Sequence, residues 1–152
     1  METAGELCVR DVVIVDRDAS IREAAVLMRQ HHVGDLVVVE TRENRNVPVG
    51  ILTDRDIAIE LVAEGVELDR ISVGDAMSFR LLTVEQDTSI YDSLEQMRER
   101  AVRRCPVVDA KGGLIGILSA DDLLEFFTEE LEALISLVHR EQARERKTRT
   151  RT

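Results

Sequence analysis

Two short stretches of this chain place a hydroxyl and a carboxylate at the same spacing. Thr53 is followed three residues later by Asp56, and Ser119 is followed three residues later by Asp122. Each hydroxyl comes directly after the run Gly-Ile-Leu, where a buried strand is expected to end and a helix to begin. The amides at a helix N-terminus attract phosphate, and an aspartate one turn later can accept hydrogen bonds from a ribose diol. A phosphate and a diol together indicate a nucleotide.

The same spacing also has a purely structural explanation. A Ser or Thr followed three residues later by an acidic residue is a capping box, in which hydroxyl and carboxylate each accept a hydrogen bond from the backbone of the first helical turn. A single copy favours this capping role. The duplication, together with the preceding Gly-Ile-Leu, favours a ligand site, and both interpretations stay open at this point.

The duplication extends over most of the chain. A shift of 69 residues aligns the first part of the two copies, as in the pair Ser20 and Ser89, and the shift falls to 66 at the pair Thr53 and Ser119. The first copy therefore has a loop that is three residues longer, at the polar segment 41–46, which we expect to be a solvated hairpin tip. The shorter segment 110–113 contains the glycines of a tight hairpin.

Both copies predict the same order of elements. The runs 12–15 and 81–84 are rich in β-forming residues, and the polar residues ending at Ser20 and Ser89 are suited to cap the helices that follow. Two strands joined by a hairpin come next, and then the helix that begins at Thr53 or Ser119. We predict an α+β fold of two βαββα repeats. The boundaries are residues 4–66 for repeat 1, 73–127 for repeat 2 and 128–152 for a C-terminal helix and basic tail, with a linker at 65–70.

The C-terminal segment lies outside the repeat. Apolar residues recur there at intervals of three or four, which predicts an amphipathic helix from about residue 120 to 147: Leu124, Phe127, Leu131, Leu134, Ile135 and Val138. The stripe must pack on something, either on its own module or on another chain. Beyond Val138 the sequence becomes basic, which is typical of a frayed, solvated tail or of an arm that docks on an acidic partner, RNA or DNA.

Composition excludes several classes of function. The formal charge is −10, divided into +4 for residues 139–152 and −14 for the rest, so only the tail could bind nucleic acid. Two cysteines, with no signal-peptide pattern and no run of membrane-spanning length, predict reduced thiols in a cytoplasmic protein without a membrane segment. Neither metal-ligand spacing nor a nucleophile with a base partner is present, so we predict no metal site and no catalytic residues.

Taken together, these motifs resemble a tandem pair of cystathionine-β-synthase (CBS) domains, often called a Bateman module. The resemblance covers residues 4–127 and rests on the duplicated Gly-Ile-Leu-[Thr/Ser]-x-x-Asp, on Arg-Cys-Pro-Val-Val-Asp at 104–109 and on Gly-Asp-Ala-Met at 74–77. It implies two repeats related by a pseudo-twofold axis, with two clefts between them. Such clefts bind AMP, ADP, ATP or S-adenosylmethionine for regulation, not catalysis.

The resemblance also implies roles for individual residues. Asp56 and Asp122 would accept the ribose hydroxyls of two equivalent sites, with Thr53 and Ser119 near the phosphate. The adenine of the first site would lie near Val13 and Val33 and the backbone of Gly34 and Asp35, and that of the second near Leu82 and Val102. Arg104 would reach the phosphate at Thr53, whereas Asp35 would repel one at Ser119. Arg55 and Arg103 would add phosphate contacts or be ordinary surface charges.

The sequence therefore predicts a non-enzymatic adenosine-nucleotide sensor. Because isolated CBS modules commonly dimerise, the resemblance favours a homodimer in which the C-terminal helix pairs with a second chain or binds a protein partner. The alternative is a structural or interaction protein whose clefts are vestigial and which acts through dimerisation, its C-terminal helix and its basic tail.

Overall fold

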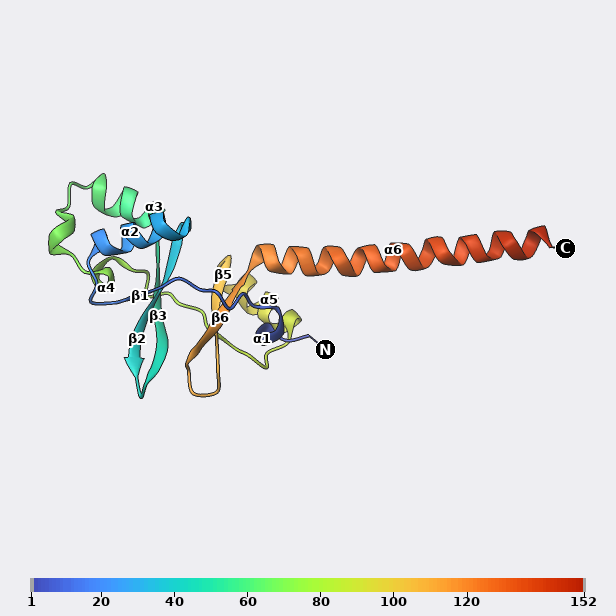
Figure 1. The fold of residues 1–152 in the computed structure, drawn as a ribbon, viewed down its shortest axis with the longest axis horizontal. Helices are drawn as coiled ribbons and strands as arrows, with labels where there is room; N and C mark the ends of the chain where they lie inside the picture. The colour runs from blue at the N-terminus through green and yellow to red at the C-terminus, as the bar shows by residue number, and fades with distance from the viewer. Residues whose placement is uncertain (1, 152) are drawn as a thin grey trace. The chain divides into compact units, whose positions relative to one another are not determined.

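The computed structural model describes residues 2–151 and divides into two compact units, one ending at Ser119 and one beginning at Ala120 (Figure 1). Two three-stranded sheets form the first unit, and in each of them a parallel pair is followed by an antiparallel hairpin. The first sheet has the order β1 (Ile14–Asp16), β2 (Asp35–Arg42) and β3 (Arg45–Thr53). The second has the order β4 (Val84–Glu85), β5 (Arg104–Val108) and β6 (Leu114–Ser119). The predicted α+β fold of two similar repeats is confirmed.

The helices that connect the strands of each repeat begin where the sequence predicts. The helix α2 (Ile21–His31) is capped by Ser20 and α5 (Ile90–Arg100) by Ser89, each serine accepting a hydrogen bond from the third residue of its helix. Thr53 caps α3 (Asp54–Asp56), which continues as the π-helical segment η1 (Ile57–Val62). A single 3₁₀ turn, η2 (Leu68–Arg70), lies within the predicted linker. The polar residues chosen from the sequence as helix starts therefore have that role.

The two hairpins differ in a way that the sequence comparison does not show. Thr41 pairs with Asn46 and Arg42 with Arg45, so four of the six residues expected to form the solvated hairpin tip extend the strands instead. Only two residues, 43 and 44, form the turn, and both have positive φ (49° and 61°), as a type I′ hairpin requires. In the second hairpin the Asp109 carboxylate accepts hydrogen bonds from the backbone amides of Gly113 and Lys111, which lower the pKa of that carboxyl.

The short helix before each repeat packs on the other repeat. In α1 (Ala4–Leu7) the amides of Ala4 and Gly5 donate to backbone carbonyls of Thr88 and Gln86, at 2.8 and 2.9 Å. In α4 (Val73–Ala76) the amides of Val73 and Gly74 donate in the same way to Ala19 and Arg17, both at 2.8 Å. The buried residues Val73 and Met77 belong to the core of the first repeat. The lead-in segments therefore cross, and each core contains a segment from the other half of the sequence.

The crossing explains the glycine of the duplicated motif. A Cβ atom on Gly116 would lie 2.6 Å from the carbonyl oxygen of Val9 and 2.6 Å from Cys8 Sγ, in the segment after α1. One on Gly50 would lie 2.9 Å from the carbonyl oxygen of Ser78, which follows α4. A strand carrying a side chain at either position could not approach the crossing segment so closely.

We therefore expect Gly116→Ala to destabilise the protein by about 1–3 kcal/mol, because the Val9 backbone would have to move. Thermal or urea unfolding of the variant measures this loss. Gly34→Ala is a matched control, since its added methyl would meet only the exposed Asp54 carboxylate, at 3.1 Å. Equal unfolding midpoints for Gly116→Ala and the unchanged protein would contradict the crossing contact.

The second unit consists of one long helix, α6 (Ala120–Thr150), of 31 residues. The predicted amphipathic helix is confirmed, but it continues through residue 128 without a break and includes the basic segment that we described as a frayed tail. Arg, Glu, Lys, Gln and Ala are strong helix formers, and cations near a helix C-terminus interact favourably with its dipole. Thr148 and Thr150 also donate hydroxyl hydrogen bonds to the carbonyls of Arg144 and Arg146.

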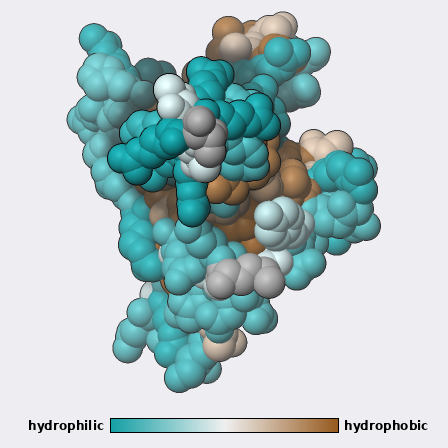
Figure 2. Space-filling view, turned by 90° about the vertical axis from the view of Figure 1, so that its right-hand side faces the viewer, coloured by the Kyte–Doolittle hydropathy of each residue, from teal (hydrophilic) through white to brown (hydrophobic). Residues whose placement is uncertain are grey.

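Polar side chains cover most of the face shown in Figure 2, and apolar side chains gather in the middle of it. Within residues 2–151, no helix combines the length and the hydrophobicity needed to cross a bilayer.

Candidate functional site

A cleft of about 240 Å³ lies between the two repeats. It is bounded by the ends of strands and by the segment that follows α4, so both halves of the sequence contribute. Its walls are formed by Asp35, Ile51, Thr53, Ser78, Arg80, Leu81, Leu82, Val102, Arg103 and Arg104. Six of the residues singled out in the sequence lie here together: Thr53, Asp35, Leu82, Val102, Arg103 and Arg104.

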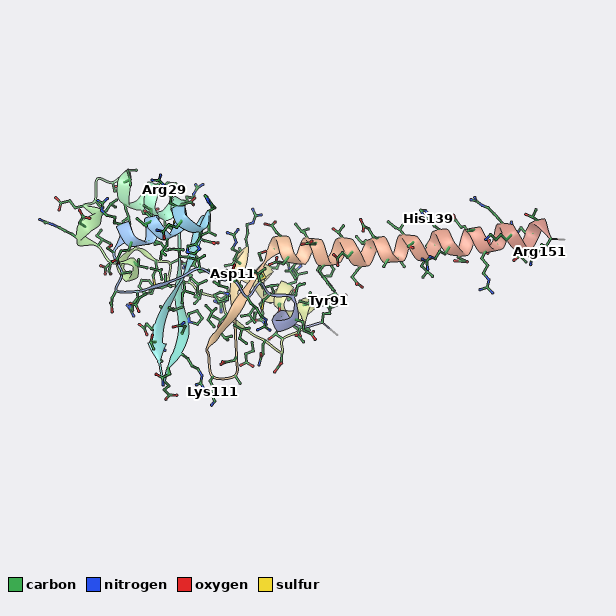
Figure 3. The ribbon with its side chains drawn as sticks, viewed as in Figure 1. Asp11, Arg29, Tyr91, Lys111, His139 and Arg151 are labelled. Atoms are coloured by element: carbon green, nitrogen blue, oxygen red, sulfur yellow. The ribbon has the colours of Figure 1, made fainter. Side chains whose placement is uncertain are left out.

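A second, smaller hollow of about 140 Å³ has the pseudo-equivalent position. It is lined by Asp11, Val12, Val13, Val33, Asp35, Val37 and Ile117. The repeat offset relates Asp11 to Arg80, and Val13 and Val33 to Leu82 and Val102. Asp11, labelled in Figure 3, lies in the segment that precedes β1. Asp35 lines both hollows, so it stands between them.

The apolar walls are grouped differently from our expectation. Leu82 and Val102, expected beside Ser119, line the cleft of Thr53, whereas Val13 and Val33, expected beside Thr53, line the hollow that contains Ile117. The physical reason is the crossing of α1 and α4. It brings the segment that follows each of these helices to the sheet of the other repeat. We did not single out Ile51, Ser78, Arg80 and Leu81, although the offset that pairs Arg80 with Asp11 was available as a signal.

Thr53 and Asp56 form a complete capping box. Thr53 Oγ1 accepts a hydrogen bond from the Asp56 amide, and Asp56 Oδ2 accepts one from the Thr53 amide, both at 3.0 Å. The structural role weighed from the sequence is therefore present. Thr53 lines the cleft in addition, while the half-buried Asp56 and the exposed Arg55 stand on the helix that begins beside it. The carbonyl of Gly34 accepts the Asp54 amide at 2.9 Å and so holds this helix start to β2.

Arg104 and Asp35 contact each other across the cleft. Arg104 Nη1 lies 2.5 Å from Asp35 Oδ2, an ion-pair separation without hydrogen-bond geometry, and Asp35 Oδ2 is buried. The Arg104 side chain is 50% exposed and that of Asp35 20%. We expected these two residues to serve separate sites, one attracting and one repelling phosphate. The structure pairs them, and this contact joins the first residue of β2 to the first residue of β5.

The charges of the two hollows differ. Arg80, Arg103 and Arg104 line the larger cleft against the single carboxylate of Asp35. Asp11 and Asp35 line the smaller one, and its other lining residues are all apolar. An anionic ligand is therefore favoured in the cleft of Thr53 and disfavoured in the other.

Ser119 and Asp122, the predicted pair of the second site, lie on either side of the sequence boundary between the two units. Ser119 ends β6 in the first unit, and Asp122 lies in the first turn of α6 in the second. Both are half-buried. Their role as a second ligand site stays a prediction.

Both cysteines lie inside the fold as reduced thiols. Cys8 and Cys105 are both buried, and burial raises the pKa of the Cys105 thiol to about 12, so that thiol is protonated at neutral pH. Over residues 2–151, His, Cys, Asp and Glu side chains do not come together in a group of three or more that could hold a metal ion.

Comparison with known proteins identifies the family. A model of the CBS domain matches residues 4–63 and 73–129. The chain belongs to the CBS domain family. A CBS domain-containing protein of Bacillus subtilis, YhcV, is 36% identical over 123 residues, which are 81% of this chain and 84% of that protein. An uncharacterized protein of Methanopyrus kandleri, MK0525, is 35% identical over 123 residues, and this CBS chain spans only 61% of its length.

Solved CBS structures show the same fold. Hypoxic Response Protein I, solved with two coordinated zinc ions, has a TM-score of 0.71 and 31% identity, covering 83% of this chain and 99% of that one. CBSX2 in complex with AMP has a TM-score of 0.69 and 27% identity, covering 85% and 98%. A hexameric CBS-CP12 protein from bloom-forming cyanobacteria has a TM-score of 0.68 and 27% identity, covering 82% and 70%.

Proposed function

We propose that this CBS pair is a regulatory, non-enzymatic module that binds an adenosine nucleotide in the cleft lined by Thr53 and Arg104. The observation that carries the proposal is the charge of this cleft, where three arginines face one carboxylate. Phosphate groups are favoured beside such a cluster and beside the helix start at Thr53. The AMP complex of CBSX2, a structural relative, supports the choice of nucleotide.

The parts of the nucleotide correspond to different residues of the cleft and to Asp56, on the helix that begins beside it. The phosphates would lie by Arg80, Arg103 and Arg104, and the base against Leu82 and Val102. The ribose would lie by Asp56, which has a second carboxylate oxygen beyond the one in the capping box. At about 240 Å³ the cleft is smaller than the roughly 300–1,000 Å³ of typical ligand sites. Binding would therefore move Arg104 away from Asp35 and widen the cleft.

Asp35 connects this binding event to the rest of the module. When Arg104 turns to a phosphate, the Asp35 carboxylate loses its ion-pair partner and becomes less favourable in its buried position. Since β2 and β5 belong to different repeats, the ligand would change the contact between repeats. A ligand that prefers one arrangement of the repeats shifts the population towards it, and a partner or a second copy could detect that shift.

A thermal-shift panel tests this function. We expect the phosphorylated ligands AMP, ADP and ATP to raise the unfolding temperature by several degrees at concentrations near 100 times Kd, where binding adds about 2.7 kcal/mol to the stability of the folded state. S-adenosylmethionine and NADH extend the panel to other adenosine ligands. Adenosine alone and inorganic phosphate are the controls for the two parts of the ligand. An unchanged unfolding temperature with every member would refute nucleotide binding.

The second candidate function is a structural or interaction protein with vestigial clefts. This alternative is favoured by contacts that already occupy the candidate site residues. Thr53 and Asp56 hydrogen-bond to each other's backbone, and Arg104 pairs with Asp35, so each of these groups has a role in the fold. This function predicts a stable oligomer whose unfolding temperature does not change with any ligand of the panel.

A further inference from the structure

The helix α6 carries an apolar stripe that faces solvent. Leu131, Leu134, Ile135 and Val138 are 59, 58, 54 and 44% exposed, and they recur at the intervals that place side chains on one face of a helix. A surface helix of a globular protein normally buries such a stripe, and the burial supplies most of the stability that a helix has in a protein. Covering the stripe would therefore stabilise α6.

The acidic and the basic residues of α6 lie on opposite sides of this stripe along the helix. Its first part carries only acidic residues, namely Asp121, Asp122, Glu125, Glu129, Glu130 and Glu132, with a formal charge of −6. Its last part carries Arg140, Arg144, Arg146, Lys147 and Arg149 against Glu141 and Glu145, a formal charge of +3, and Arg151 directly after the helix raises it to +4. Figure 3 marks His139 and Arg151 in this basic part. The helix is thus acidic before the stripe and basic after it.

We propose that α6 binds α6 of a second copy of this chain in the antiparallel direction, with the stripes in contact around residues 131–138. This arrangement sets the acidic part of each helix beside the basic part of the other. A parallel pair would set like charges together along its whole length. The macrodipoles of two antiparallel helices also oppose each other favourably. The contact is symmetric, so it closes on a dimer and leaves no unpaired surface for further growth.

Charge argues against other occupants of the stripe. Residues 1–119 carry 14 basic and 22 acidic residues, a net charge of −8, so the chain's own first unit would repel the acidic part of α6. A nucleic acid would be repelled by that part as well, and it offers no apolar surface for the leucines. Only a partner with both signs of charge in the reverse order matches the whole helix, and a second copy has this pattern.

The mass of the full-length protein in solution tests the pairing. We expect a dimer by light scattering coupled to size exclusion, and we expect the double variant Leu131→Asp, Leu134→Asp to raise the dimer dissociation constant by at least 100-fold. Val62→Asp is the matched control, because Val62 is equally exposed (58%) but lies in η1 of the first unit. A monomeric protein overturns the proposal. So does a dimer that Val62→Asp dissociates and the double variant leaves intact.

The contribution of charge is tested by reversal. Arg140→Glu combined with Arg144→Glu should weaken the dimer at least tenfold in low salt, and adding Glu125→Arg and Glu129→Arg should restore it. Lys111→Glu, at the β5–β6 hairpin tip, changes charge without touching α6 and should leave the dimer unchanged. Failure of the fourfold variant to recover would contradict charge complementarity.

Spin labels determine the direction of the pair. In an antiparallel pair the distance between equivalent residues grows by about 3 Å for each residue from the centre, since the helical rise is about 1.5 Å. Labels at Ser136→Cys should therefore lie close together, and labels at Thr148→Cys about 40 Å apart. Short distances at both positions would show a parallel pair and overturn the proposal. Because none of these measurements needs a nucleotide, they stand apart from the ligand panel.

Discussion

Replacing Asp56 by alanine is expected to weaken nucleotide binding by about 10- to 100-fold. In the proposed complex the Asp56 carboxylate accepts hydrogen bonds from the ribose hydroxyls. Hydrogen bonds to a charged group contribute about 1.5–3 kcal/mol, and each 1.4 kcal/mol is a tenfold change in Kd. Calorimetric titration of the variant with ATP measures the loss. Asp122→Ala should have a smaller effect, and the reverse order of the two variants would contradict the assignment.

The capping role of Asp56 requires a control of its own. Removing a capping carboxylate costs about 1 kcal/mol of stability, which could lower affinity indirectly. Asp75 supplies the matched case: with Ser72 it forms the same box at the start of α4, at 3.1 and 3.2 Å, and it does not line the cleft. Asp75→Ala should therefore lower stability to a similar extent and leave ATP affinity unchanged.

The local structure of the repeats could be predicted from their sequence. Ser20, Ser89 and Thr53 begin helices because their hydroxyls satisfy the unpaired amides of the first turn, a signal contained in four consecutive residues. The repeat offset then assigned the same elements to the second copy. The hairpin tip was predicted as a loop over residues 41–46 instead of a two-residue turn at Glu43 and Asn44, because a turn with positive φ at both positions is usually marked by glycine, and here it is not.

The composition of the site could be predicted only in part. Thr53 was found because a duplicated motif marks it, and Arg104 because the family resemblance implies a basic residue there; both line one cleft. Leu82 and Val102 line the cleft of Thr53 and not a hollow beside Ser119 as expected, because their position depends on the crossing of α1 and α4. That crossing joins residues 54 to 84 positions apart and leaves no periodic pattern in the sequence. The contact of Arg104 with Asp35 likewise joins two repeats and residues 69 positions apart, so no local pattern predicts it.

Arg104→Ala is expected to lower the affinity for ATP by about tenfold and to leave the affinity for adenosine almost unchanged. The guanidinium can donate to phosphate oxygens, and its half exposure places the loss near the lower end, about 1.5 kcal/mol, of the range for charged hydrogen bonds. Titration with ATP, AMP and adenosine separates the phosphate contribution from that of the base and ribose. Arg29→Ala on α2 removes an arginine that does not line the cleft and should change none of the three affinities.

Asp35→Asn distinguishes a phosphate contact from a purely structural role of Arg104. If Arg104 serves only to neutralise Asp35, removing the carboxylate makes the arginine dispensable, and Arg104→Ala added to Asp35→Asn has no effect on ATP binding. If Arg104 binds phosphate, Asp35→Asn releases it and removes a repelling charge, so ATP affinity rises by a few-fold and still falls when Arg104 is then removed. In the single variant Asp35→Asn the affinity for ATP should therefore rise and the affinity for adenosine should stay unchanged, because only a phosphate responds to the lost carboxylate.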